Sequence, residues 1–209
     1  MKVLLINGSP KANGCAYTAL NEVATTLNNE DIQTEIFQIG KEAVQGCIDC
    51  GHCFSAGECV FQDDIVSTAL EKAKESDGFV FGSPVYYAAA SGQMTALMNR
   101  MFYSSRGVFA HKPGAAVVCC RRAGSTAALD QLNKYMTISQ MLLVGSQYWP
   151  MVHGSNPDQA RKDLEGMQVM RVLGRNMAWV LKSIQAGREA GIQKPEPEQQ
   201  RHWTNFIRE

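Results

Sequence analysis

The chain has 209 residues, enough for one sizeable domain or two small ones, and 45% of them are hydrophobic, which argues against disorder. Its 20 Lys and Arg balance its 20 Asp and Glu, so there is no basic excess to draw the whole protein to nucleic acid or an anionic membrane. The longest apolar runs, such as 115–120, are far shorter than the roughly 20 residues that span a bilayer. Because the first residues lack a secretion-signal pattern, we expect a soluble, cytoplasmic protein.

Short apolar runs alternate with helical patterns along the chain. In chain order we expect strands at 3–6, 34–39, 78–82, 115–120 and 141–144, and helices at 14–28, 65–73 (after Asp64 as N-cap), 93–103, 126–137 and 158–186. Strands that are buried on both faces and alternate with helices form parallel sheets. The sequence therefore predicts an α/β fold with an open, doubly wound, five-stranded parallel sheet and helices on both faces.

In such a sheet, ligands bind outside the carboxyl ends of the strands. The turn after the first strand reads GSPKANG (8–14) and opens directly into a helix, whose unpaired N–H groups and partial positive charge favour an anion. Ser9 adds a hydroxyl and Lys11 a cation. Because the glycine patterns of triphosphate and dinucleotide loops are missing, we interpret this turn as a cradle for one phosphate. The alternative is a plain strand-to-helix turn.

Two further strand ends carry candidate binding residues. The turn after the third strand contains Tyr86 and Tyr87 followed by small residues, which suits a flat ring, although the two tyrosines can also simply cover the sheet end. The turn after the fourth strand contains Arg121 and Arg122, which are able to offset charge on an anionic ring or to remain solvated.

Together, GSPKANG and GSPVYYAAASGQM (82–94) resemble the flavodoxin-like NAD(P)H-dependent FMN reductase family, and within it most closely the iron–sulfur flavoproteins. The similarity runs over nearly the whole chain up to the final helix. It implies a flavodoxin-like fold and an FMN cofactor. The first turn would hold the phosphate, the third the ribityl chain and isoalloxazine, and the fourth the pyrimidine edge. The residues so implied are Ser9, Lys11, Asn13, Gly14, Cys15, Ala16, Tyr17, Pro84, Val85, Tyr86, Tyr87, Arg122, Ala123 and Gly124.

This chain departs from the family at one point of the phosphate turn. The family usually places Asn-Thr where this chain has Cys15 and Ala16. Two side-chain contacts to phosphate are then replaced by backbone N–H groups, Tyr17 or Thr18.

Four of the seven cysteines fall in a short loop at about 46–60: Cys47, Cys50, Cys53 and Cys59. Three thiolates at C-x2-C-x2-C spacing can face one cuboidal cluster, whereas zinc sites more often use two separated pairs. Free or redox-active thiols are the third possibility. The resemblance to iron–sulfur flavoproteins implies a 4Fe-4S cluster. We interpret Cys15, Cys119 and Cys120 as small buried hydrophobes.

The segment after the fifth strand, 147–154, is rich in aromatic residues. We expect Tyr148 and Trp149 to pack in the core, although with His153 they can also line a substrate pocket or a subunit contact.

We divide the chain into a flavin-binding domain at 1–190 and a C-terminal arm at 191–209, since two prolines prevent the last helix from continuing. Trp203, Phe206 and Ile207 make the arm apolar. It therefore packs on its own domain or crosses to a neighbouring subunit.

The functional expectation is an FMN-dependent oxidoreductase that takes electrons from NAD(P)H or a reduced carrier and passes them to a quinone, flavin or other small acceptor, with the 4Fe-4S cluster as a relay. The flavin performs the chemistry, so no general acid or base is named. The alternative is an electron carrier between ferredoxin-like partners, and a third hypothesis is a structural zinc module. We expect a homodimer or homotetramer.

Overall fold

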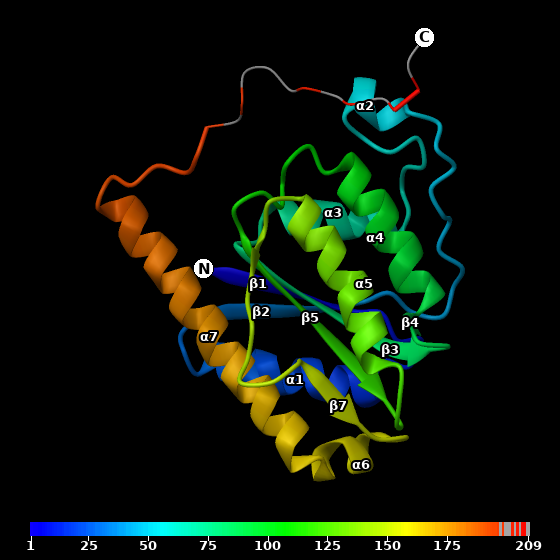
Figure 1. Ribbon diagram of the computed structural model, residues 1–209, viewed down its shortest axis with the longest axis vertical. Helices are drawn as coiled ribbons and strands as arrows, with labels where there is room; N and C mark the ends of the chain where they lie inside the picture. The colour runs from blue at the N-terminus through cyan, green and yellow to red at the C-terminus, as the bar shows by residue number, and fades with distance from the viewer. Residues whose placement is uncertain (197, 199–201, 203, 205, 208–209) are drawn as a thin grey trace.

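The computed structural model describes residues 1–209 except 197, 199–201, 203, 205, 208 and 209, and a parallel sheet lies at its centre (Figure 1). The sheet order is β2-β1-β3-β5-β6, with bounds β1 Lys2–Asn7, β2 Gln33–Gln38, β3 Gly78–Tyr86, β5 Pro113–Cys120 and β6 Leu142–Leu143. All of these pairs are parallel. This is the predicted doubly wound sheet, with the strand order of flavodoxin. It differs from the prediction beside β5, where two short strands replace the single strand expected at 141–144.

The fifth position of the sheet is filled by two short strands instead of the single predicted one. β6 pairs with the start of β5, and β7 (Met151–His153) pairs with its end, where His153 lies opposite Cys120. Between them the chain leaves the sheet. The third strand is also longer than predicted, because after Gly82 it continues into a hairpin with β4 (Ala89–Ala90). β7 therefore adds a fourth parallel strand end to the edge where ligands bind in such folds.

Helices cover both faces of the sheet (Figure 1). One layer contains α1 (Cys15–Asn28), α6 (Pro157–Lys162) and α7 (Leu164–Glu189), and the other α3 (Ile65–Lys74), α4 (Gly92–Ser104) and α5 (Ser125–Ile138). Leu5 packs with the first layer and Leu4 with the second, and neither is exposed, which explains the continuous apolar run of β1. Within the described residues, no helix is long and apolar enough to cross a membrane.

The single helix predicted at 158–186 is wrong. Asp163 ends α6 and caps α7, and its carboxylate accepts a hydrogen bond from the Gly166 N–H at 2.9 Å. Asp64, by contrast, caps α3 as predicted, in a reciprocal arrangement with Ser67.

The buried Ser91 connects the first and third strand ends. Its hydroxyl donates to the Gly8 carbonyl at 2.6 Å and accepts from the Met94 N–H at the start of α4. Its own N–H donates to the Ser83 hydroxyl at 2.9 Å. A second link joins the same turns directly, from the Gly8 N–H to the Gly82 carbonyl at 2.8 Å. The two turns are thus held at a fixed separation.

We expect Ser91→Ala to lower the free energy of unfolding by about 1–3 kcal/mol, because it removes the cap of α4 and leaves the buried Gly8 carbonyl without its donor. Urea unfolding of the cofactor-free protein measures this. Ser183→Ala on the exposed face of α7 is the control, with an expected change within about 0.5 kcal/mol. Equal stabilities for the two variants would contradict the role assigned to Ser91.

Candidate flavin site and cysteine loop

The turn after β1 is held in shape by side chains from two strands. The Asn7 carboxamide oxygen accepts from the Ser9 N–H at 3.1 Å, and the Gln38 amide donates to the Ser9 carbonyl at 2.6 Å. Asn7 also donates to Gln38, at 2.6 Å. The Ser9 hydroxyl accepts from the Lys11 N–H at 3.1 Å. Sequence reasoning missed Asn7 and Gln38. For Asn7 the signal was present, since a buried Asn beside a turn commonly bonds backbone two residues on.

The start of α1 is open to an anion. Its N-cap is Gly14, no side chain caps it, and its first turn contains no acidic residue. The N–H groups of the first turn therefore keep their donor capacity and partial positive charge, with the exposed Lys11 nearby. Cys15 is half-buried rather than fully buried as predicted, and its thiol lies 3.5 Å from the Gly154 carbonyl. Burial raises the pKa of the Cys15 thiol, so this thiol stays neutral.

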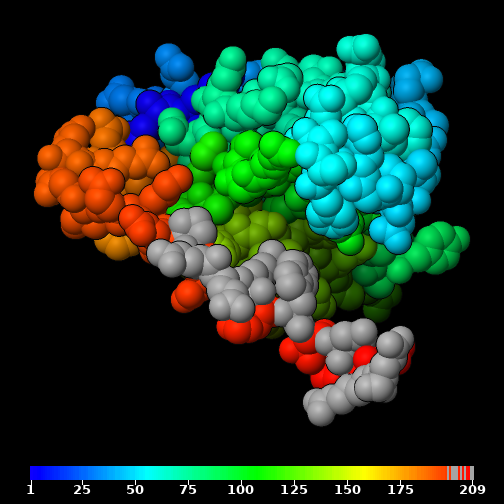
Figure 2. All heavy atoms as spheres, turned by 90° about the horizontal axis from the view of Figure 1, so that it is seen from above, coloured from blue at the N-terminus to red at the C-terminus, as the bar shows by residue number. Residues whose placement is uncertain are grey.

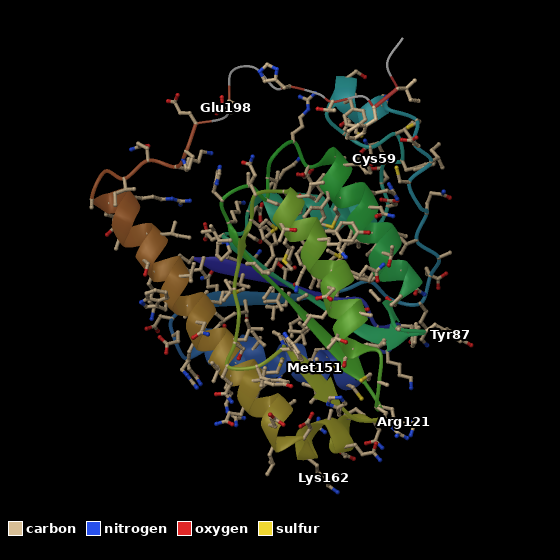
Figure 3. All side chains as sticks on the ribbon, viewed as in Figure 1. Cys59, Tyr87, Arg121, Met151, Lys162 and Glu198 are labelled. Carbon is tan, nitrogen blue, oxygen red and sulfur yellow. The ribbon has the colours of Figure 1, made fainter. Side chains whose placement is uncertain are left out.

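The hairpin between β3 and β4 turns on two non-glycine residues in the left-handed region. Tyr87 has a φ of 50° and Ala88 a φ of 61°, a two-residue turn for which Asn-Gly is preferred. Such conformations cost about 1–2 kcal/mol per residue and cluster at functional sites. Tyr87 is fully exposed and points away from the molecule (Figure 3), while 47% of Tyr86 is exposed.

The loop after β5 packs against this hairpin. Gly124 caps α5 with a φ of 86°, and a Cβ placed there would lie 2.9 Å from the Ala88 Cα. The Ala90 N–H also donates to Gln131 of α5, at 3.0 Å. Arg121 and Arg122 are exposed, and Arg121 lies at the same edge of the molecule as Tyr87 (Figure 3). All the sequence-predicted flavin residues are therefore gathered on three adjoining strand ends.

The aromatic segment between β6 and β7 does not pack in the core, so that expectation is wrong. Tyr148 and Trp149 are 54% and 56% exposed and contact each other, with ring centroids 5.2 Å apart. The cause is the interruption of the fifth strand position. His153 lies beyond it at the end of β7, where its N–H donates to the Asp163 carboxylate at 2.7 Å.

We expect Gly124→Ala to weaken FMN binding at least about tenfold, because the substitution strains a positive φ and pushes the loop away from the hairpin, with strain of about 1–3 kcal/mol. Flavin fluorescence titration of the cofactor-free protein measures the effect. Gly92→Ala is the matched control, since a Cβ there has no neighbour within 4 Å and φ is not positive. Unchanged affinity for Gly124→Ala would show that this contact does not shape the site.

The cysteine loop contains a short helix missed by sequence reasoning, α2 (His52–Ala56), flanked by Gly51 and Gly57 with φ of 71° and 79°. The loop forms a compact bulge on the surface, coloured cyan in Figure 2. One aromatic contact and one hydrogen bond hold this loop against the end of α4 and the residues after it. The ring centroids of Phe54 and Tyr103 are 6.0 Å apart, and the Arg106 guanidinium donates to the Ser55 carbonyl at 3.1 Å.

All four cysteines of the loop line one small cavity, and all are free thiols. Burial raises the pKa of the Cys53 thiol, and negative charge on the neighbouring Cys47, Cys59 and Cys50 raises it further. Within the described residues, no three His, Cys, Asp or Glu side chains converge closely enough to bind a single metal ion. The four thiols instead line one cavity together, and a 4Fe-4S cluster takes one thiolate for each iron.

The cysteine loop and the predicted flavin-binding residues lie at opposite ends of α4. Figure 3 shows Cys59 near α2, well away from Tyr87 and Arg121. α4 has 13 residues and is therefore about 20 Å long. The structure thus gives two separate candidate sites.

Sheet order and strand-end loops define the class, a flavodoxin-like α/β protein. The model of the NADPH-dependent FMN reductase family matches residues 1–156. An iron–sulfur flavoprotein of Methanocaldococcus jannaschii is 33% identical over 193 residues, which cover 88% of this chain and 99% of that protein. The chain belongs to the NADPH-dependent FMN reductase family, whose members are flavin-dependent oxidoreductases.

Solved structures support the fold. RosB with bound 8-demethyl-8-formylriboflavin-5′-phosphate superposes with a TM-score of 0.69 at 13% identity, covering 99% of this chain and 92% of RosB. A flavodoxin from the domain Archaea gives a TM-score of 0.60 at 14% identity, covering 87% of this chain and 99% of the flavodoxin.

Proposed function

We propose that the protein binds one FMN per chain at the carboxyl edge of the sheet. The observation that carries this proposal is the convergence of three strand-end loops beside an uncapped helix start. The α1 N-terminus, Ser9 and Lys11 would bind the phosphate. The hairpin with Tyr86 and Tyr87 would face the isoalloxazine, and the loop with Arg122 would face its pyrimidine edge. The full proposed set is Ser9, Lys11, Asn13, Gly14, Cys15, Ala16, Tyr17, Pro84, Val85, Tyr86, Tyr87, Arg122, Ala123 and Gly124.

The cysteine loop is proposed to hold a 4Fe-4S cluster through Cys47, Cys50, Cys53 and Cys59. Two observations support it: the four thiols line one cavity, and the relative from Methanocaldococcus jannaschii is named an iron–sulfur flavoprotein. A bound cluster would supply one-electron chemistry beside the two-electron chemistry of a flavin. Because reduced thiols persist in reducing compartments, we also place the protein in the cytoplasm.

The proposed reaction is the oxidation of NADH or NADPH and the reduction of a quinone, a flavin or another small acceptor. Bound FMN would supply the hydride chemistry, and the protein would position the FMN and restrict the access of water to its ring. The side chains at this edge of the sheet are exposed, among them Tyr86, Tyr87 and Arg121. A second substrate can therefore reach an isoalloxazine ring placed there. We further propose residues 1–190 as the flavin-binding domain, residues 191–209 as an arm, and a homodimer or homotetramer.

Anaerobic stopped-flow mixing tests this function. We expect the flavin absorbance to bleach with NADH or NADPH, and to return when a quinone is added. If neither nucleotide bleaches the flavin but a reduced ferredoxin does, the protein is an electron carrier and the enzyme proposal is wrong.

Substitutions should affect the two cofactors separately, because the two sites lie at opposite ends of α4. We expect Cys50→Ala to lose iron and sulfide while retaining FMN. Tyr86→Ala should retain iron and bind FMN about threefold to tenfold more weakly, the amount expected for one aromatic contact. Metal analysis and flavin titration of both variants measure this, and loss of both cofactors in either variant would contradict two separate sites.

A further inference from the structure

Arg100 on α4 is a buried charge that sequence reasoning did not single out. It is the largest of the fully buried side chains, with 1% exposed. Its guanidinium makes three polar contacts with the cysteine loop and its continuation: Nε donates to the Cys59 Sγ at 3.2 Å, Nη1 to the Gln45 carbonyl at 3.3 Å, and Nη2 to the Phe61 carbonyl at 2.9 Å. One side chain therefore fastens both sides of the loop to α4.

Asp64 is the counter-ion of this arginine. One of its carboxylate oxygens pairs with Arg100 Nη1, and the other accepts the N–H groups of Val66 and Ser67 as the cap of α3. The Phe61 ring lies 5.1 Å from the guanidinium carbon and adds a cation–π contact. Because an unpaired buried charge is very unfavourable, this paired arrangement keeps a positive charge inside the protein beside Cys59.

The contact with Cys59 is not needed to anchor the loop, because two carbonyls and Asp64 already hold the guanidinium. A hydrogen bond from an arginine N–H to a cysteine sulfur is strongest when that sulfur carries negative charge, as a metal-bound thiolate does. Hydrogen bonds to cysteine sulfurs and nearby charge are among the factors that set the potentials of iron–sulfur clusters.

We propose that Arg100 is a positioning residue for the cluster ligand Cys59 and raises the reduction potential of the cluster. This inference rests on the 4Fe-4S cluster of the proposed function. One-electron reduction of a cluster adds one negative charge and neither makes nor breaks a bond to the protein. The buried guanidinium and its Nε–H stabilise that added charge, and the Asp64 carboxylate opposes the effect.

The pair therefore predicts shifts of opposite sign. Arg100→Gln removes the positive charge and should lower the ratio of reduced to oxidised cluster at a fixed potential about tenfold, which corresponds to about 59 mV for a one-electron couple. Asp64→Asn keeps a cap acceptor for α3 and removes the opposing charge, so it should raise that ratio. Arg100→Lys keeps the charge without the fork of donors and should give a smaller fall than Arg100→Gln.

The test uses the full chain reconstituted anaerobically with iron and sulfide, with iron and sulfide content measured first and the potential then measured by an EPR-monitored redox titration. Arg106→Gln is the matched control. Its side chain touches the same loop at the Ser55 carbonyl but is exposed and, within the described residues, makes no hydrogen bond to a cysteine. Arg106→Gln should therefore shift the cluster potential much less than Arg100→Gln does. A merely structural role for Arg100 would change cluster content but not potential.

The outcomes separate the two proposals. A cluster in the unmodified protein, with potentials shifted in opposite directions by Arg100→Gln and Asp64→Asn, supports the role of Arg100. If Arg100→Gln retains no cluster, the Arg100→Lys potential decides: a fall below the potential of the unmodified protein supports the inference and an unchanged potential overturns it. A loaded cluster whose potential neither variant changes overturns the inference alone. An unmodified protein that incorporates no iron and sulfide overturns the proposed cluster and, with it, this role.

Discussion

The proposed site depends on one feature, the uncapped N-terminus of α1 at the carboxyl edge of the sheet. Helix starts are commonly capped by Ser, Thr, Asp or Asn, whereas α1 begins after Gly14 with no side-chain cap and no acidic residue in its first turn. The structure keeps this end fixed through Asn7, Gln38 and Ser9, which brace the preceding turn. Donors that are held in place and left unpaired are what a preorganised phosphate site requires.

The rest of the edge is arranged around this turn. Ser91 holds the end of β3 against the end of β1, and the contact of Gly124 with Ala88 holds the loop after β5 against the hairpin. α4 then runs from this edge to the cysteine loop, where the Arg100 guanidinium holds the loop through hydrogen bonds. A single helix thus ties both candidate sites to one rigid sheet, and each site remains chemically separate.

Much of this was predictable from local sequence, and the failures have identifiable causes. The strands β1, β3 and β5 were predictable because burial on both faces produces continuous apolar runs, and Asp64 because a cap residue precedes a helical pattern. Asp163 was missed because helical patterns continue on both sides of it. β7 was missed because the apolar Tyr148 and Trp149 before it were assigned to the core. In the structure both are exposed, and they lie in the segment that interrupts the fifth strand position. Arg100 was missed because its charge partners come from distant positions, although its place within the apolar stretch of α4 was a signal.

The most direct test of the account compares FMN with riboflavin, which lacks only the phosphate, in fluorescence titrations of the cofactor-free protein. Charged hydrogen bonds to a phosphate at the start of α1 predict binding of FMN, one per chain, at least about 100-fold tighter than riboflavin, or about 2.7 kcal/mol. Equal affinities would contradict the account, because they would show that the helix start contributes nothing to binding.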